Sequence, residues 1–326
     1  MKNCVFGVDI GGTSVKIGCF TSDVQLLDKW EIPTRRAEEG AYILSDVAVS
    51  VREYADQHGL TGDEITGIGL DVPGPVLADG IVNRSVNLGW GRFNVAGALA
   101  EEIKKAFQTH RLIEVKVAND ANAAALGELF DGAGKGYSSL VMVTLGTGIG
   151  GGVVIDKQAL AGSVGAAGEI GHIKVNGEET EKCGCGKCGC LEQYASATGI
   201  VRLAKRHLAE IDESGSFAEG ASALTGEENL SAKTVMDAAK KGDTIALAVY
   251  EEVCKYLGEA LSGVCAVVDP QVVVIGGGVS AAGDFLISGI KKYFNASAFH
   301  ALKDKPILRA KLGNDGGIYG AVRLVL

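Results

Sequence analysis

Two short apolar runs, CVFGVDI and SVKIGCF, open the chain and flank a turn of Gly11, Gly12 and Thr13. Short runs rich in β-branched and aromatic residues on either side of a glycine turn predict a β-hairpin. The stretch SLVMVTLGTGIGGGVVID, which starts at Ser139, repeats the order of strand, glycine turn and strand. Two copies of one plan predict two related domains.

The stretch 41–60 has apolar residues at helical spacing, which predicts a helix that ends before Gly59. Further helices are expected at 95–110, 234–242, 244–268 and 284–294, and further strands at 64–72, 113–120 and 271–277. Strands that alternate with helices predict an α/β protein. The segment 209–234 is rich in small and polar residues, so we expect a surface excursion there.

The composition is that of a soluble protein with a large core. The chain has 326 residues, about two domains of about 150 residues each, and 47% of them are apolar. Its net charge of −9 disfavours a nucleic-acid or anionic-membrane surface, which needs clustered Lys and Arg. The first residues are typical of a strand rather than a signal peptide, and no apolar run approaches the roughly 20 residues of a membrane helix. We therefore expect a cytoplasmic protein.

The first glycine turn could hold an anion. Backbone N–H groups that converge without side chains in the way form such a cradle. Around Gly11 and Gly12, Thr13 would add a hydroxyl donor, Lys16 a cation and Asp9 a contact for Mg²⁺. The spacing is not that of the P-loop. A hairpin turn that needs positive φ explains these glycines equally well when they are considered alone.

A second turn holds Gly146, Thr147 and Gly148, and with Gly151 it matches the Gly-x-Gly-x-x-Gly spacing of dinucleotide-binding proteins. That fold requires a helix directly after the glycines, whereas the residues here are strand-like, so we disfavour an NAD-dependent dehydrogenase. A third loop, which follows an apolar strand, contains Gly276, Gly277 and Gly278. Three glycine loops that each follow a strand favour a nucleotide held between two domains.

Four of the eight cysteines crowd into CGCGKCGC, and His172 precedes them. In a reducing compartment this density favours metal over disulfides. A tetrahedral Zn²⁺ site takes four such ligands, and the chain offers five candidates: His172, Cys183, Cys185, Cys188 and Cys190. Reduced thiols on a loop, or a redox site, remain alternatives.

Asn119 and Asp120 lie at the junction of a predicted strand and an Ala-rich helix. Either residue type is favoured there as a helix N-cap. The alternative is catalytic: a carboxylate at a helix N-terminus stays ionised and could accept the proton of a substrate hydroxyl during phosphoryl transfer.

Two glutamates lie close in sequence to the metal candidates, one of which is His172. Glu169 and His172 are three residues apart and would share a face if that segment is helical, and Glu192 follows Cys190 closely. Together they could form a hydroxyl-binding pocket. Solvated surface glutamates and a packed histidine are the alternative.

Six segments in order (DIGGTSVK, DVPGPV, ANDANAAALGE, TLGTGIGGGVV, GEIGH and CGCGKCGCLE) resemble the ROK family of bacterial sugar kinases. The resemblance implies an actin/hexokinase-like (ribonuclease H-like) α/β fold of two domains around a central cleft. It places residues 1–117, with a returning C-terminal segment at about 311–326, in the first domain and residues 118–310 in the second. It also implies ATP, Mg²⁺ and a structural Zn²⁺.

The same resemblance implies a role for each site residue. Asp120 would be the catalytic base, and the sugar contacts would be Gly74, Asn119, Asp120, Glu169, His172 and Glu192. Phosphate contacts would come from Gly11–Thr13 and Gly146–Gly148, and adenosine would lie near Gly276–Gly278. The zinc ligands would be His172, Cys183, Cys185 and Cys190; Cys188 falls at a variable position and is left out.

Within the family the chain is most similar to the members that phosphorylate glucose at its 6-hydroxyl, so this is the reaction we expect. Another hexose (N-acetylmannosamine, allose or fructose) is the first alternative, and the donor could be polyphosphate instead of ATP. A sugar-responsive repressor is less compatible, because the phosphate loop begins at Asp9 and leaves no preceding DNA-binding domain. The family also implies a homodimer or homotetramer.

Overall fold

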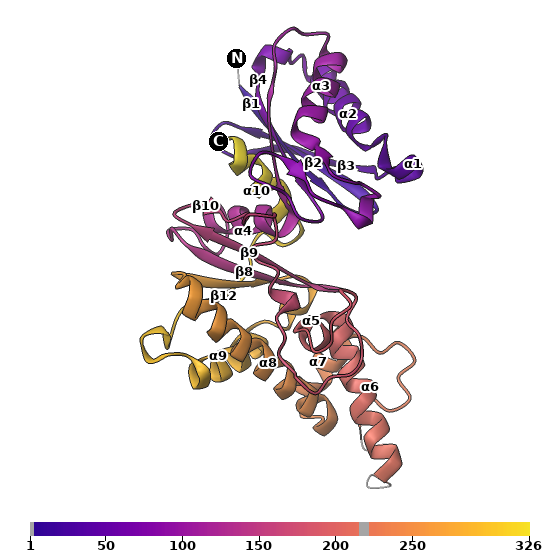
Figure 1. Cartoon of the computed structure of the whole chain (residues 1–326), viewed down its shortest axis with the longest axis vertical. Helices are drawn as coiled ribbons and strands as arrows, with labels where there is room; N and C mark the ends of the chain where they lie inside the picture. Colours follow the sequence, from indigo (N-terminus) through magenta and orange to yellow (C-terminus); the bar gives the residue numbers. More distant parts are fainter. Residues whose placement is uncertain (1–2, 215–221) are drawn as a thin grey trace. The chain divides into compact units, whose positions relative to one another are not determined.

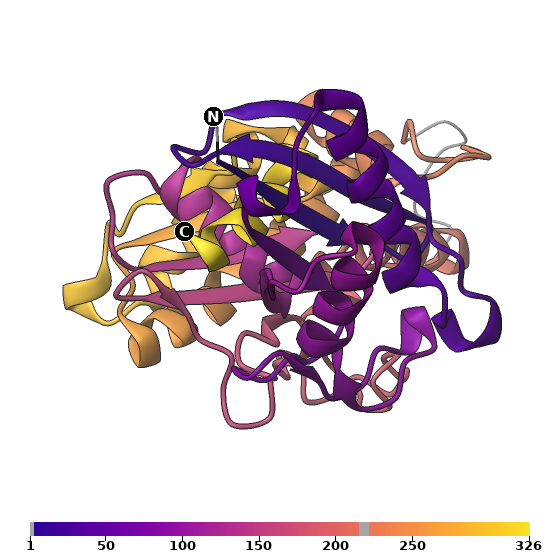
Figure 2. The same ribbon diagram turned by 90° about the horizontal axis from the view of Figure 1, so that it is seen from above.

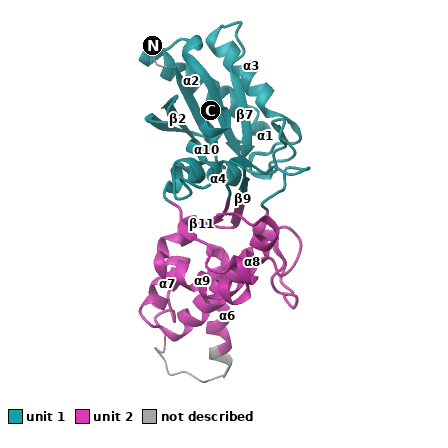
Figure 3. Cartoon of the chain, turned by 90° about the vertical axis from the view of Figure 1, so that its left-hand side faces the viewer, with its two compact units in different colours: residues 1–139, 152–168, 311–326 teal, residues 140–151, 169–310 magenta. Residues whose placement is uncertain are grey.

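The computed structural model describes residues 3–214 and 222–326. By internal contacts the chain divides into two compact units (Figure 3). Unit 1 comprises residues 1–139, 152–168 and 311–326, and unit 2 comprises residues 140–151 and 169–310. Unit 1 extends past residue 117, where we expected the boundary, because helix α4 (Asp120–Phe130) packs against α10 (Gly316–Val325).

Unit 1 is built on a five-stranded sheet of order β3-β2-β1-β4-β7, in which β2 is antiparallel to β1 and β3, and β1, β4 and β7 are parallel. Its elements other than α4 and α10 are β1 (Cys4–Ile10), β2 (Ser14–Thr21), β3 (Leu26–Pro33), α1 (Ala37–Gly40), α2 (Ile43–His58), β4 (Ile65–Val72), β5 (Ile81–Val82), β6 (Phe93–Asn94), α3 (Val95–Phe107), β7 (Glu114–Asn119) and β10 (Gln158–Ala159). The predicted hairpin is β1 and β2, and the helix predicted over 41–60 is α2, which ends at a left-handed Gly59 as expected.

Both faces of this sheet are covered. The larger core packs strand residues such as Phe6 and Leu70 against the apolar faces of α2 and α3. On the opposite side, α10 packs on β1 and β4, and Ile318 and Val322 join a smaller cluster (Figures 1 and 2). The approach of α10 depends on a glycine in β4, since a Cβ on Gly69 would lie 1.7 Å from the Ala321 carbonyl oxygen.

A second sheet has the order β10-β9-β8-β11-β12, with β8, β11 and β12 parallel. The elements from β8 onward, apart from β10 and α10, are β8 (Leu140–Leu145), β9 (Ile149–Ile155), α5 (Glu192–Ala195), α6 (Ala197–Ser214), α7 (Ala232–Lys240), α8 (Thr244–Val268), β11 (Val272–Gly276), α9 (Asp284–Ser297) and β12 (Ile307–Arg309). Within unit 2, α8 packs against α6, α7 and α9. The strand expected after the second glycine turn is β9, so the helix that a dinucleotide fold requires is not there.

The expected surface excursion over 209–234 is wrong for its first part. Residues 209–214 continue α6, and the last residues of the segment start α7, which Ser231 caps. Residues 215–221 lie outside the described residues. Residues 209–214 are mostly small or charged and show no clear amphipathic spacing in the sequence, whereas buried apolar residues such as Ile200 and Leu203 lie earlier in α6.

Candidate active site

Asn119 and Asp120 stand where β7 ends and α4 begins. Asn119 caps α4, and its Oδ1 accepts hydrogen bonds from the backbone N–H groups of Ala121 (3.0 Å) and Asn122 (3.2 Å). Its Nδ2 donates to Oδ1 of Asp120 at 2.8 Å. Asp120 is exposed, and the same Oδ1 accepts the N–H of Ala121. The amide of Asn119 therefore holds an accessible carboxylate at the positive end of a helix.

Gly74 adjoins this pair from the loop after β4. Its carbonyl oxygen accepts the second hydrogen bond of Asn119 Nδ2, at 3.1 Å. The residue has φ of +108°, and a Cβ would lie 2.5 Å from the carbonyl oxygen of Arg84. Only glycine suits that conformation and space, so the loop brings its backbone directly to Asn119.

Two further carboxylates lie at the ends of neighbouring parallel strands. Asp9 of β1 and Asp71 of β4 are register partners. Asp71 is fully buried, and neither of its oxygens has a hydrogen-bond partner among the described residues. Burial, with the adjacent Asp9 carboxylate, raises the pKa of Asp71 well above its usual range, and burial also raises the pKa of Asp9. Adjacent carboxyl oxygens are donors of the kind that Mg²⁺ takes, so these residues fit that ion.

In the first glycine loop, neither Gly11 nor Gly12 has positive φ, so a strained turn does not explain them. A Cβ on Gly12 would meet open space, and the Thr13 side chain is exposed. Lys16 lies opposite Asp9 in the β1–β2 ladder, and its Nζ bonds the carbonyl oxygen of Asn314. The loop thus presents bare backbone beside Asp9, while Lys16 is tied to the turn before α10.

The second and third glycine loops line one cavity within unit 2. Gly146 and Thr147 form one wall and Gly278 another, around a volume of about 430 Å³. A Cβ on Gly278 would meet nothing, whereas Gly277 has φ of +78° and packs against Leu145. Gly276 ends β11 directly before this turn.

The remaining walls of the cavity come from α7 and its cap, which we did not identify from the sequence. Two apolar and three polar or charged residues line them: Ala232, Met236, Ser231, Lys233 and Asp237. Their short helix carries no motif, so only the packing of α7 against the turn after β11 brings them to the glycine loops.

The cysteine-rich segment, residues 176–190, forms a compact donor cluster with His172 in unit 2. The donor atoms of His172, Cys183, Cys185 and Cys190 all lie within 4.8 Å of one another. Sγ of Cys185 is 3.6 Å from Sγ of Cys190, and Sγ of Cys183 is 3.9 Å from Nδ1 of His172. A tetrahedron with zinc–sulfur bonds of about 2.3 Å has edges of about 3.8 Å, so these residues fit Zn²⁺.

Cys188 is not part of that cluster. Its Sγ donates to the carbonyl oxygen of Thr180 at 3.4 Å, across the base of the same segment. The structure therefore brings together four of the five candidate zinc ligands. The fifth, Cys188, instead links the two sides of the cysteine-rich segment through Thr180.

Glu169 and Glu192 lie beside the cluster, of which His172 is a member. Residues Ile170–His172 form a 3-10 helix, and Nε2 of His172 lies 3.9 Å from Oε2 of Glu169, while Nδ1 faces Cys183. Glu169 is half exposed. One ring nitrogen of His172 is thus directed at the metal ligands and the other at the outer carboxylate.

Glu192 is not a solvated surface charge. Its Oε2 accepts the backbone N–H of Ile149 at 3.0 Å, and its Oε1 lies 3.6 Å from Sγ of Cys183. A Cβ on Gly148 would lie 2.2 Å from the same Oε2. Gly148 therefore makes room for Glu192, which joins the second glycine loop to the cysteine cluster.

Among the described residues, no helix is long and apolar enough to span a membrane.

The similarities to known proteins extend over the whole chain. The chain is 42% identical to the glucokinase of Halalkalibacterium halodurans over 98% of its own length and 94% of that protein. Among solved structures, the ROK family glucokinase of Streptomyces griseus, determined with glucose and AMPPNP, shares 31% identity and a TM-score of 0.72, with 98% of each chain covered. The ROK hexokinase of Thermus thermophilus shares 28% identity and a TM-score of 0.75, with 98% and 97% covered.

These structures and the two sheets define the class of the protein: its fold is the actin/hexokinase-like α/β fold. The ROK family model matches residues 5–326, and the chain belongs to the ROK family.

Proposed function

We propose that this protein is a glucokinase that transfers the γ-phosphoryl group of ATP to the 6-hydroxyl of glucose. The observation that carries the proposal is its 42% identity to a glucokinase over nearly all of both chains. The S. griseus relative, which binds glucose and AMPPNP, supports ATP as the donor.

Asp120 is the proposed catalytic base. Its carboxylate is exposed and is oriented by Nδ2 of Asn119 and the N–H of Ala121. As the 6-oxygen attacks the γ-phosphorus, the hydroxyl proton passes to Asp120. Phosphoryl transfer has a loose transition state, so the protein acts mainly by positioning groups and neutralising charge.

The nucleotide is held by backbone rather than by long side chains. Bare amides at Gly11–Thr13 and Gly146–Gly148 bind phosphate oxygens, and the cavity beside Gly278 takes the adenosine. Asp9, with Asp71 beside it, would hold Mg²⁺, which supplies positive charge at the phosphate oxygens when bound.

The sugar is bound by Gly74, Asn119, Asp120, Glu169, His172 and Glu192. His172, Cys183, Cys185 and Cys190 would hold a structural Zn²⁺, which fixes the His172 ring so that Nε2 faces a sugar hydroxyl. A thiolate site needs reduced cysteines, which supports a cytoplasmic location. A homodimer or homotetramer remains our prediction for its assembly.

The test of the base is Asp120→Asn, which keeps the shape of the side chain and removes its ability to accept a proton. We expect kcat to fall by about 10²–10⁴-fold with little change in KM for glucose, because general-base catalysis is typically of that size. Coupled-assay kinetics measure both constants. Asp79→Asn, an exposed aspartate of the same unit, is the control and should keep wild-type kinetics. Near-normal turnover by Asp120→Asn would refute the assignment.

The test of the substrate is a panel of sugars with ATP, comparing glucose with N-acetylmannosamine, allose and fructose. We expect the highest kcat/KM for glucose. A higher kcat/KM for another sugar would show that this sugar, and not glucose, is the preferred substrate, and the protein would still be a sugar kinase.

A further inference from the structure

The helical turn α5 (Glu192–Ala195) carries three consecutive side chains, Glu192, Gln193 and Tyr194, that each hydrogen-bond a different part of unit 2. Glu192 accepts the N–H of Ile149, the first residue of β9 directly after the second glycine loop. Gln193 accepts the N–H groups of Gly189 (2.8 Å) and Cys190 (3.1 Å) with its Oε1. The orientation of this one turn therefore sets both the proposed sugar ligand Glu192 and the backbone of a metal ligand.

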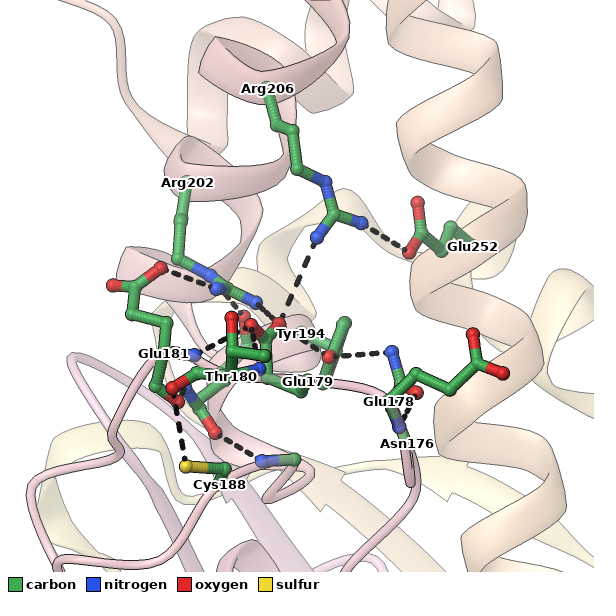
Figure 4. A network of polar contacts seen from close by, with 12 residues as sticks. Asn176, Glu178, Glu179, Thr180, Glu181, Cys188, Tyr194, Arg202, Arg206 and Glu252 are labelled. Carbon is green, nitrogen blue, oxygen red and sulfur yellow. Dashed lines mark hydrogen bonds and ion pairs between the residues drawn. The ribbon is translucent and has the colours of Figure 1, made fainter.

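The third residue, Tyr194, connects the turn to the start of the cysteine-rich segment. Its side chain is fully buried, and its hydroxyl donates to Oε2 of Glu179 at 2.6 Å. The same hydroxyl accepts a hydrogen bond from Nδ2 of Asn176 at 3.0 Å. Residues before the cysteines are thus held against α5 (Figure 4).

Arg202, on α6, occupies the centre of these contacts (Figure 4). Its Nη2 donates to Glu179 at 2.8 Å and its Nη1 to Glu181 at 2.6 Å. Its Nε donates to the backbone carbonyl of Gln193 at 3.2 Å, and the guanidinium lies over the ring of Tyr194. One side chain therefore binds the cysteine-rich segment and α5 at the same time.

The network is mostly shielded from solvent. The side chain of Glu179 is 7% exposed and that of Arg202 is 21% exposed. The hydrogen bond from Arg202 lowers the pKa of Glu179 to about 2. The carboxylate is therefore charged and paired with Arg202 at neutral pH.

The tip of the cysteine-rich segment is open, since a Cβ on Gly184 or Gly186 would meet nothing within 4 Å. Its base is packed, with Cys183 and Cys190 buried. The geometry of the ligands must therefore come from the metal itself or from the base of the segment. Some side chains do not bind the metal but hold its ligands in place through hydrogen bonds. Their mutation typically lowers metal affinity by about 10–100-fold.

We propose that Arg202 is a positioning residue that locks the cysteine-rich segment to α5, and so presets both the metal ligands and the sugar-binding carboxylate of Glu192. The proposal rests on the metal and sugar sites of the proposed function. It goes beyond them, because the hydrogen bonds of Arg202 go to Glu179, Glu181 and Gln193, none of which is a proposed metal or sugar ligand.

The test is Arg202→Lys in the full-length protein, stripped of metal and titrated with Co²⁺. Lysine keeps the charge but cannot bind two carboxylates and a carbonyl in one planar fork. We expect the Co²⁺ dissociation constant, read from thiolate charge-transfer absorption, to rise by about 10–100-fold. We also expect KM for glucose to rise while kcat changes less.

The matched control is Arg323→Lys. Arg323 makes a two-point ion pair with Asp131 in unit 1, at 2.6 and 2.8 Å, so the substitution is chemically the same. It should lower the melting temperature without changing Co²⁺ affinity or KM for glucose. If Arg202→Lys folds poorly, Tyr194→Phe removes only the hydroxyl that binds Glu179, and the same shifts are expected in smaller size.

Wild-type Co²⁺ affinity and glucose KM in both Arg202→Lys and Tyr194→Phe, with only a lower melting temperature, would show a purely structural role and overturn the proposal. Absence of Co²⁺ binding by the wild type would instead overturn the metal site itself, and this inference with it.

Discussion

At the scale of single residues, Asn119 shows that a structural and a functional role can coexist. Its Oδ1 caps α4, as residues of this type commonly do. Its Nδ2 is left to bind Asp120 and the carbonyl of Gly74. The two explanations that the sequence left open are therefore compatible, because an amide has an acceptor at one end and donors at the other.

Asp71 yields a stability prediction. Its carboxyl is fully buried, and its oxygens have no hydrogen-bond partner among residues 3–214 and 222–326, so the loss of hydration on burial should destabilise the folded state. Asp71→Asn removes the ionisable group at nearly constant volume. We expect the metal-free protein to melt several degrees higher at neutral pH, about 2–4 °C for each kcal/mol gained.

Differential scanning calorimetry measures that change. Asp63→Asn is the control, since Asp63 is exposed and its replacement should leave the melting temperature within error. A lower melting temperature for Asp71→Asn would mean that the carboxyl has a stabilising partner.

At the scale of elements, the sequence predicted those with a clear hydrophobic period. The hairpin β1–β2, the helices α2, α3, α8 and α9 and the strand β11 are confirmed. The helix α6 was not predicted, because its polar C-terminal part resembles a loop in composition. The glycine loops were predicted. Only the coordinates show whether each glycine is needed for a positive φ or leaves open space beside the backbone.

Two glycines of α8 allow a sharp test of helix packing. A Cβ on Gly258 would lie 2.7 Å from the backbone nitrogen of Phe294 in α9, whereas one on Gly263 would meet nothing. Gly263→Ala should therefore stabilise the protein by about 0.5–1 kcal/mol through helix propensity. Gly258→Ala should destabilise it by about 1–3 kcal/mol, because it forces α8 and α9 apart.

Chemical unfolding of both variants measures these free energies. Because the same substitution is made in the same helix, each variant controls for the other. Equal effects would contradict the packing of α8 on α9.

At the scale of the whole molecule, two units each carry part of the proposed machinery. Unit 1 contains Asp9, Asp120 and the first glycine loop, and unit 2 contains the cysteine cluster and the adenosine cavity. Metal binding should therefore stabilise unit 2 more than unit 1.

Removal of the metal with a chelator is expected to lower the melting temperature and raise KM for glucose, because His172 and Glu192 lose their fixed neighbour. Far-ultraviolet circular dichroism should change little, since no strand of the two five-stranded sheets contains a residue of the cluster. Calorimetry and kinetics before and after zinc is restored check this. Full activity in metal-free protein, verified by elemental analysis, would contradict a role for the metal.

The sequence by itself determined the α/β class, most element positions, the glycine loops and the residue types of the site. These depend on local period, turn chemistry and short spacings, which are readable along the chain. Only the tertiary structure decided that Asp71 lies beside Asp9, that Glu192 binds Ile149, that α7 lines the cavity and that Arg202 joins α6 to the cysteine-rich segment. These partners are far apart in the chain, and it is the packing of elements that brings them together, so no local pattern could have shown them.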